Sequence, residues 1–422
     1  MTNRILVIFS TWLAVSVATV AQINCPTTPP ANTQLKLVCL VPFQSNSGVN
    51  GLALNGPIGA QLSQLPLPAL VSGIVTYSDA KGNEIPYYNL GPIILDRPET
   101  VRRGRLVLGF GFQQFDFNSL DGINLDSVPF TYSLSGGTGD NQYTEYIAQQ
   151  QHISFKYDQY LMLASYGLTH STDVTVLVPI ARVSVGAGTL PGGLGYIVFQ
   201  DPLRNRPFNP TVNYFHGSAT GVGDVLISAK HVLWNGGETE RTSVAAGGTL
   251  RVPSGDAQNY LGSGAFGFNV FGLIAYKARF SPHAKIAYQW NSSSDLLKLP
   301  GATDTKLPGG FQTAAGLDVR LNRKLTLAVD FLGNEFVNSP SFQQVPTDIP
   351  YNTPSGTTPV SGVKVVSHTY TTANLSTGVK WKPFKSHELI LYGNVLTQLN
   401  NVGLRSDIVP SGGISYSWDF RK

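Results

Sequence analysis

Charged residues recur at alternate positions of several polar–apolar stretches, and they are the side chains best placed to act on a solute. Those expected to face one interior are Lys156, Asp158, Asp224, Lys230, Lys277, Lys285, Asp318, Arg320, Asp330, Lys380 and Glu388. Both signs are present, and charges removed from water are usually paired. One interpretation is a network of ion pairs that stabilises a wall, and the other is a polar path that orients a small solute.

Other chemistry has little support in the residues. The histidines stand in no recognisable nucleophile motif, and they are His152, His170, His216, His231, His283, His368 and His387. No Cys/His cluster indicates zinc, and the glycine-rich piece at 192–195 lacks the strand-to-helix setting of a phosphate cradle. We therefore predict no enzyme activity, no metal and no cofactor. The slight basic excess is not interleaved with aromatic residues, which argues against a nucleic-acid partner.

The composition favours a membrane protein built from strands. Only 13% of the 422 residues are charged, whereas a soluble domain carries about 25%. After the N-terminus no segment approaches the roughly 20 continuous apolar residues of a membrane helix. A closed barrel is the other structure that can cross a bilayer. A large soluble β-sandwich is the alternative.

The first residues have the pattern of a cleaved secretory signal. Arg4 precedes an apolar run at 5–15, and small residues follow at 18–21, so residues 1–21 are the expected signal peptide. In the oxidising compartment beyond it, Cys25 and Cys39 are expected to form a local disulfide. A lipid-anchored Cys25 is the weaker alternative, because residues 22–24 lack the Leu and small residues of such processing sites.

Residues 22–103 do not resemble barrel wall, because prolines punctuate them and proline cannot donate to a sheet ladder. Residues 59–65 favour a helical turn or two, and 71–89 a small hairpin broken at 79–83. We interpret 22–103 as a compact element that plugs or underlies a barrel, with a loosely ordered periplasmic extension as the alternative.

The stretch from Gly264 to Asn291 shows what the wall is made of. Its even-numbered positions are apolar on both sides of Ser281-Pro282, and aromatic residues sit near both ends of that face. Tilted membrane strands of about 9–11 residues carry such aromatic girdles. About twelve comparable strands follow one another in residues 104–420, which predicts an all-β, up-and-down antiparallel transmembrane barrel.

The connections alternate in length, which orients the predicted barrel. Long connections are expected at 117–147, 186–220, 254–263, 293–309, 338–366 and 399–409, with tight turns between them. Outer-membrane barrels have long external loops and short periplasmic turns. The final strand, 413–420, resembles the C-terminal assembly signal of outer-membrane proteins, although Arg421 and Lys422 follow its last aromatic residue. That resemblance implies recognition by the barrel assembly machinery.

Several stretches resemble one outer-membrane barrel family, named after the MetA pathway of phenol degradation. They are 166–169 with 173–180, then 221–225, 250–256 and 316–327, and the resemblance covers roughly residues 150–420. It implies a transporter-like barrel in the bacterial outer membrane, in contact with lipid. We expect passive uptake of small hydrophobic or aromatic solutes through a barrel gated by residues 22–103. The alternative is a non-transporting structural or adhesive protein that acts through its long external loops.

Overall fold

The computed structural model describes most of the chain from Cys25 to Phe420. The described residues are 25, 35–40, 55–69, 76–78, 84–86, 89–136, 143–188, 195–199, 206–208, 214–236, 241–298, 305–350, 357–384 and 388–420. The expected signal peptide therefore lies outside them, as do residues 421 and 422.

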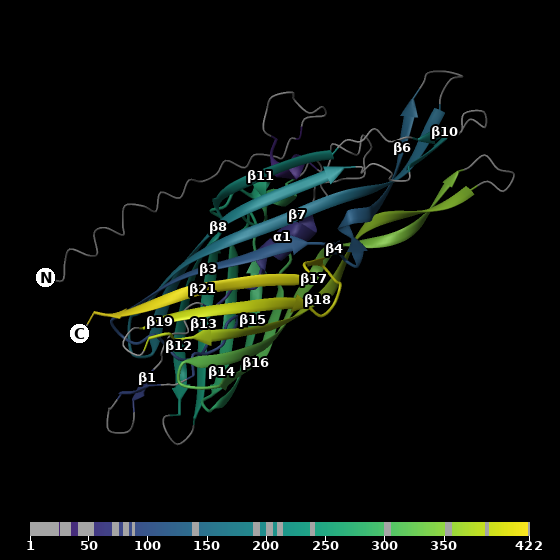
Figure 1. The fold of residues 1–422 in the computed structure, drawn as a ribbon. Coiled ribbons are helices and arrows are strands. Elements are labelled where there is room, and N and C mark those ends of the chain that lie inside the picture. The colour runs from purple at the N-terminus through teal and green to yellow at the C-terminus, as the bar shows by residue number, and fades with distance from the viewer. Residues whose placement is uncertain are drawn as a thin grey trace.

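Twelve antiparallel strands close into a barrel, as the alternation predicted (Figure 1). The last strand pairs with the first, and this pairing runs from Ser411–Gln113 to Asp419–Arg105. The wall strands are β3 (Arg105–Phe117), β7 (Tyr143–Gly167), β8 (Thr172–Gly188), β12 (Val225–Asn235), β13 (Thr242–Val252), β14 (Gly267–Tyr276), β15 (Phe280–Asn291), β16 (Gly310–Arg320), β17 (Leu325–Pro350), β18 (Thr357–Trp381), β19 (Leu389–Gln398) and β21 (Ile408–Asp419).

The outer face of β14 and β15 is apolar, which confirms the predicted orientation of this hairpin. Phe268, Ile274, Ile286 and Trp290 are all exposed, while the odd-numbered residues between them point inward. Tyr288 packs edge-on against Trp290, with ring centroids 4.4 Å apart. A closed ladder leaves no unpaired edge to lipid. The molecule therefore has the architecture of a membrane-spanning barrel.

Smaller elements lie at the ends of the barrel and inside it. No helix of the described residues is long and apolar enough to span a membrane. The small elements are η1 (Leu37–Cys39), α1 (Asn55–Ser63), β1 (Thr76–Ser78), β2 (Glu84–Pro86), β4 (Ser119–Leu120), β5 (Ile123–Asn124), η4 (Leu125–Ser127), β6 (Val128–Gly136), β9 (Gly195–Phe199), β10 (Arg206–Phe208), β11 (Tyr214–Val222), η6 (Ala257–Asn259), η7 (Asp295–Leu297) and β20 (Leu404–Arg405). β1 pairs with β2 as the hairpin predicted within 71–89. Helix α1 begins four residues before the predicted helical turn.

Two predicted long loops are largely strand. The connection predicted at 338–366 continues β17 and β18 as a hairpin that pairs out to Pro350 and Thr357, and β6 occupies much of 117–147. Pro340 and Pro346 lie within this hairpin. Beyond Asn334, β17 is paired with β18 but no longer with β16, and an edge strand tolerates proline. The hairpins project from the end of the barrel opposite β1 (Figure 1).

The wall changes partner at one point, between β11 and β12. Residues 180–188 of β8 pair with β11, and residues 172–177 of β8 pair with β12. Gly223 and Asp224 lie between the end of β11 and the start of β12. Among the described residues no strand pairs with the other edge of β11. Leu261 packs beside this edge, so close that a methyl group on Gly221 would lie 2.9 Å from its Cδ1 atom. The segment around η6 therefore covers the break.

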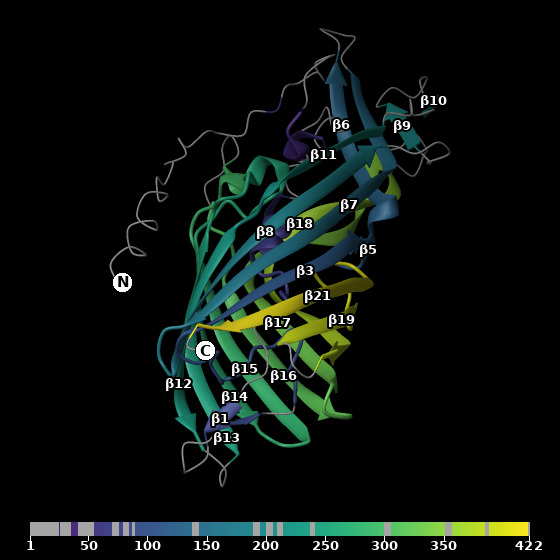
Figure 2. The same cartoon turned by 60° about the vertical axis from the view of Figure 1, so that its left-hand side comes forward.

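The main apolar core lies inside the outer half of the barrel. It joins Leu37 and Leu40 near η1, Ile58 of α1, and inward-facing wall residues such as Phe115 and Phe155. Helix α1 lies within the circle of strands in both views (Figure 1 and Figure 2). Residues from the N-terminal segment thus complete a core that the wall alone would leave open.

Candidate functional site

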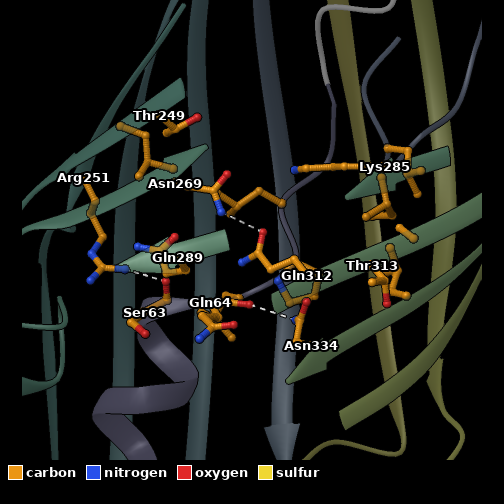
Figure 3. A pocket seen from close by; sticks show the side chains of 18 residues that line it. Ser63, Gln64, Thr249, Arg251, Asn269, Lys285, Gln289, Gln312, Thr313 and Asn334 are labelled. Atoms are coloured by element: carbon orange, nitrogen blue, oxygen red, sulfur yellow. Dashed lines mark hydrogen bonds between the residues drawn. The ribbon is translucent and has the colours of Figure 1, made fainter. Parts of the chain in front are cut away.

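A cavity of about 210 Å³ lies in the lumen, between the N-terminal segment and the wall strands β12 to β17 (Figure 3). One part of its lining is polar and the other apolar. The polar part includes Gln64, Thr249, Arg251, Asn269, Lys285, Gln289, Gln312 and Asn334, and the apolar part includes Leu65, Leu67, Ile94, Leu95, Leu226, Ala314 and Leu332. Pockets that bind small molecules combine these two kinds of surface.

The polar side of the cavity is built by strand alternation. Asn269, Gln289 and Gln312 stand at inward positions of three adjacent strands, and Asn269 donates a hydrogen bond to Gln312 Oε1 at 3.1 Å. Arg251 of β13 donates to Asn291 Oδ1 at 2.7 Å, and its guanidinium lies 3.6 Å from the Asp224 carboxylate. The guanidinium is therefore already compensated by an acid.

The N-terminal segment is tied to the wall where it passes this cavity. Arg251 also donates to the Ser63 carbonyl at the end of α1. Asn334 donates to the Gln64 carbonyl at 3.4 Å, and Gln113 donates to the Pro66 carbonyl at 3.2 Å. A backbone without its own sheet partners is thus satisfied by wall side chains, as buried polar groups require.

A second set of contacts anchors residues 89–103 at the end of the lumen that faces the short turns. Asp96 pairs with Lys230 at 2.9 Å, Arg97 with Asp318 at 3.4 Å, and Glu99 with Lys277 at 3.6 Å. Two wall strands and the turn after β14 therefore hold one internal segment through charges of opposite sign. Each pair includes at least one almost fully buried side chain, so solvent screening is weak.

Backbone groups of the same segment are also bound to the wall. The Leu90 amide donates to Thr326 Oγ1 at 3.0 Å, and the Val101 amide donates to the Asp173 carboxylate at 3.3 Å. Asn89 donates to Ser281 Oγ at 3.1 Å. The segment therefore occupies the lumen along its length rather than at one point.

Most of the charged residues predicted to be internal are buried on the inner face. They are Asp224, Lys230, Lys277, Asp318, Asp330 and Lys380. Lys285 lines the cavity, and Arg320 and Glu388 are half-buried at inward positions. His283, which the sequence left without a role, lies between Asp330 at 2.8 Å and Asp318 at 3.6 Å.

Lys156 and Asp158 are a correction, because both stand at outward positions of β7. Lys156 is exposed and pairs with Asp116 at 3.1 Å on the outer surface. The neighbouring residues Phe155 and Tyr157 point inward and pack in the core. The odd-numbered residues of β7 face inward along the strand, and Leu161 and Leu163 are buried as well. The apolar set that the alternation assigned to lipid therefore packs on the interior.

The sequence prediction missed the charged partners that come from the N-terminal segment. Asp96, Arg97 and Glu99 fall within four residues, which is dense for a chain with 13% charged residues. That density was a usable signal. Arg251 and Gln64 were also missed, although strand alternation places Arg251 on the inner face.

The predicted disulfide partners are bonded in the structure. Cys25 and Cys39 are joined, with their Cα atoms 5.4 Å apart. Among the described residues no group of three or more His, Cys, Asp or Glu side chains is arranged to hold a metal ion.

Comparison with known proteins supports the resemblance found in the sequence. Residues 134–341 match the family model described as "Putative MetA-pathway of phenol degradation". The match confirms the predicted family resemblance. It begins before residue 150, where the expected range starts, and it ends well before residue 420, where that range ends. No curated protein matches this chain.

Three solved structures are similar to this chain at low sequence identity. An outer membrane channel from Pseudomonas putida F1 is 12% identical, with 77% of this chain and 100% of that chain covered and a TM-score of 0.45. The toluene transporter TbuX of Ralstonia pickettii is 13% identical, with 85% and 99% covered and a TM-score of 0.34. The P. putida toluene transporter TodX is 12% identical, with the same coverage and TM-score.

Proposed function

We propose that this barrel is a passive outer-membrane channel for small hydrophobic or aromatic solutes, and that its N-terminal segment is the gate. The observation that carries the proposal is the half-apolar cavity inside the lumen, whose lining includes Gln64, Leu65, Leu67 and Ile94 of that segment. A sealed structural barrel has no need of such a chamber. The family description, which names phenol degradation, agrees with an aromatic solute.

The gate is assigned to residues 89–103 because they cross the lumen. Ion pairs and hydrogen bonds hold them to the wall, and Leu90, Ile93 and Leu95 are buried with them. Displacement of residues 89–103 breaks three ion pairs and the hydrogen bonds to Thr326, Asp173 and Ser281, but it leaves the ladder hydrogen bonds between the barrel strands intact. We therefore expect the segment to move while the wall stays closed.

A reversible crosslink tests the gate. Asn89 and Ser281 touch through their side chains, so the double variant Asn89→Cys/Ser281→Cys joins the segment to β15. Liposome-swelling rates with a neutral aromatic solute are compared before and after reduction. We expect slow permeation in the oxidised form and recovery on reduction. The parent chain with reductant is the control, because its Cys25–Cys39 bond is also reduced. Equal permeation in both redox states would contradict the gate.

The second candidate is a surface protein that acts through its external hairpins. It is favoured by one observation, the extension of β17 and β18 well beyond the barrel as a paired hairpin. Shortening that hairpin by removal of residues 343–364 would then abolish binding to a partner surface and leave solute permeation unchanged. If permeation is absent in every form of the protein and binding depends on the hairpin, this second function replaces the first.

A further inference from the structure

One lysine in the cavity stands apart from the acids that the structure describes. Of the described residues that line the cavity, Lys285 and Arg251 have charged side chains. Arg251 has Asp224 at 3.6 Å. Among the described residues no carboxylate lies within ion-pair distance of Lys285, and its contact is with the face of Phe271, 5.3 Å from the ring centroid. The Lys285 side chain points into the cavity (Figure 3).

The acid that influences Lys285 from a distance is already paired with another lysine. This acid is Asp96, which has an electrostatic effect on Lys285 but accepts a hydrogen bond from Lys230 at 2.9 Å. A cation held away from bulk water without a partner is costly, and an anion that enters the cavity removes that cost. Among the described residues, the chamber therefore holds one lysine side chain that has no carboxylate of its own.

A second polar group in the cavity is also unsatisfied. Gln64 is 4% exposed, and neither its side-chain nitrogen nor its side-chain oxygen has a hydrogen-bond partner in the part of the chain that the structure describes. Buried amides are normally hydrogen-bonded, so an unpartnered one in a cavity indicates a missing ligand or water. The Gln64 amide nitrogen is a donor that suits a carboxylate oxygen.

We propose that this cavity is a binding site for a small amphipathic carboxylate with a single ring or a short chain. The carboxylate pairs with the Lys285 ammonium, and the apolar part packs against Leu65, Leu67 and Leu226. The size of the ligand follows from the volume, since 210 Å³ is below the roughly 300–1,000 Å³ of sites for drug-sized molecules. The proposal deepens the proposed function by naming the solute class, and its transport arm rests on that function.

Binding of benzoate and benzamide to the full-length protein in detergent tests the site. These two probes share a ring and differ in charge. We expect benzoate to bind at least about tenfold more tightly than benzamide, which corresponds to about 1.4 kcal/mol. In Lys285→Met benzoate should lose that advantage, while benzamide binding stays nearly constant. Lys156→Met is the matched control, because it removes an exposed lysine of the outer surface.

Two further variants and one probe keep the test decisive. Lys285→Arg should retain the preference for benzoate, and Gln64→Leu should weaken it even if Lys285→Met does not fold. Benzoate binding that is unchanged in both Lys285→Met and Gln64→Leu would overturn the site. Acetate that binds as tightly as benzoate would overturn the role of the apolar side.

Liposome swelling separates this proposal from the proposed function. If neutral aromatic solutes permeate but benzoate has no advantage that depends on Lys285, the channel stands and the carboxylate site falls. If no solute permeates, the channel falls, and the binding measurement in detergent still decides whether the site exists.

Discussion

The Asp96 carboxylate on the internal segment lies 2.9 Å from the Lys230 ammonium on wall strand β12. Lys230 is buried and also donates to the Arg97 carbonyl at 2.7 Å, with Asp173 at 4.0 Å. One lysine therefore holds both the side chain and the backbone of the segment. This arrangement makes residues 96 and 97 the firmest attachment of the proposed gate.

Removal of the Asp96 charge should loosen that attachment. Asp96→Asn leaves Lys230 with the Asp173 carboxylate at 4.0 Å, and a hydrogen bond to a charged group contributes about 1.5–3 kcal/mol. We expect a higher single-channel open probability in planar bilayers. A double-mutant cycle with Lys230→Met isolates the pair, because coupled residues in contact depart from additivity. Additive effects of the two substitutions would show that the pair does not hold the segment.

A charge on the lipid face of β15 should destabilise the barrel, although the barrel accepts a charged residue at the adjacent, inward-facing position 285. Ile286 is 60% exposed, and it follows the inward-facing Lys285. Arginine near the middle of a lipid-facing strand costs about 2–4 kcal/mol. Ile286→Arg should therefore lower the free energy of unfolding from lipid by that amount, with Ile286→Leu as the control. A wild-type value for the arginine variant would place Ile286 away from lipid.

The pH dependence of the external layer should follow Asp121, between β4 and β5. Burial raises the pKa of Asp121 above its ordinary value of 3.8. The backbone amides of Phe342 and Gly403 donate hydrogen bonds to its carboxylate at 2.6 and 2.8 Å, and they oppose this rise in pKa. A raised pKa in the folded state means that this group contributes most stability below pH 3.8 and loses it as pH rises through the raised pKa.

The measurement for Asp121 is the difference in melting temperature between the wild type and Asp121→Asn across pH 3 to 8. The wild type should lose stability relative to the variant as pH rises through the raised pKa, because only the wild type acquires a buried charge. A difference that is flat with pH, or that grows in favour of the wild type, would contradict this assignment.

The Cys25–Cys39 bond should stabilise the segment that packs near η1 rather than the wall. Closing a loop of about 15 residues contributes about 3 kcal/mol in the chain-entropy model. The variant Cys25→Ser/Cys39→Ser should be cleaved faster by trypsin at Lys36, where the side chain pairs with Asp256 at 2.6 Å. The melting temperature of the barrel should stay the same. A large fall in that temperature would mean that the bond supports the wall itself.

Strand alternation predicted the barrel well where the strands cross the bilayer. In β14 and β15 the even-numbered apolar residues face lipid and the odd-numbered residues face the lumen, because water and lipid impose opposite demands on the two faces. The same rule placed Lys230, Asp318 and Asp330 inside. It was wrong for Lys156 and Asp158, because the outer part of β7 packs its apolar face on an internal core.

By itself, the sequence determined the closed sheet, the number of strands, their inner and outer faces within the bilayer, and the set of charges available to the lumen. These properties depend on local periodicity, which each strand carries in its own residues. Only the tertiary structure decided that Asp96, Arg97 and Glu99 meet Lys230, Asp318 and Lys277, and that no described carboxylate pairs with Lys285. Such pairings join residues more than a hundred positions apart, and no local pattern encodes which partners the path of a segment through the lumen brings together.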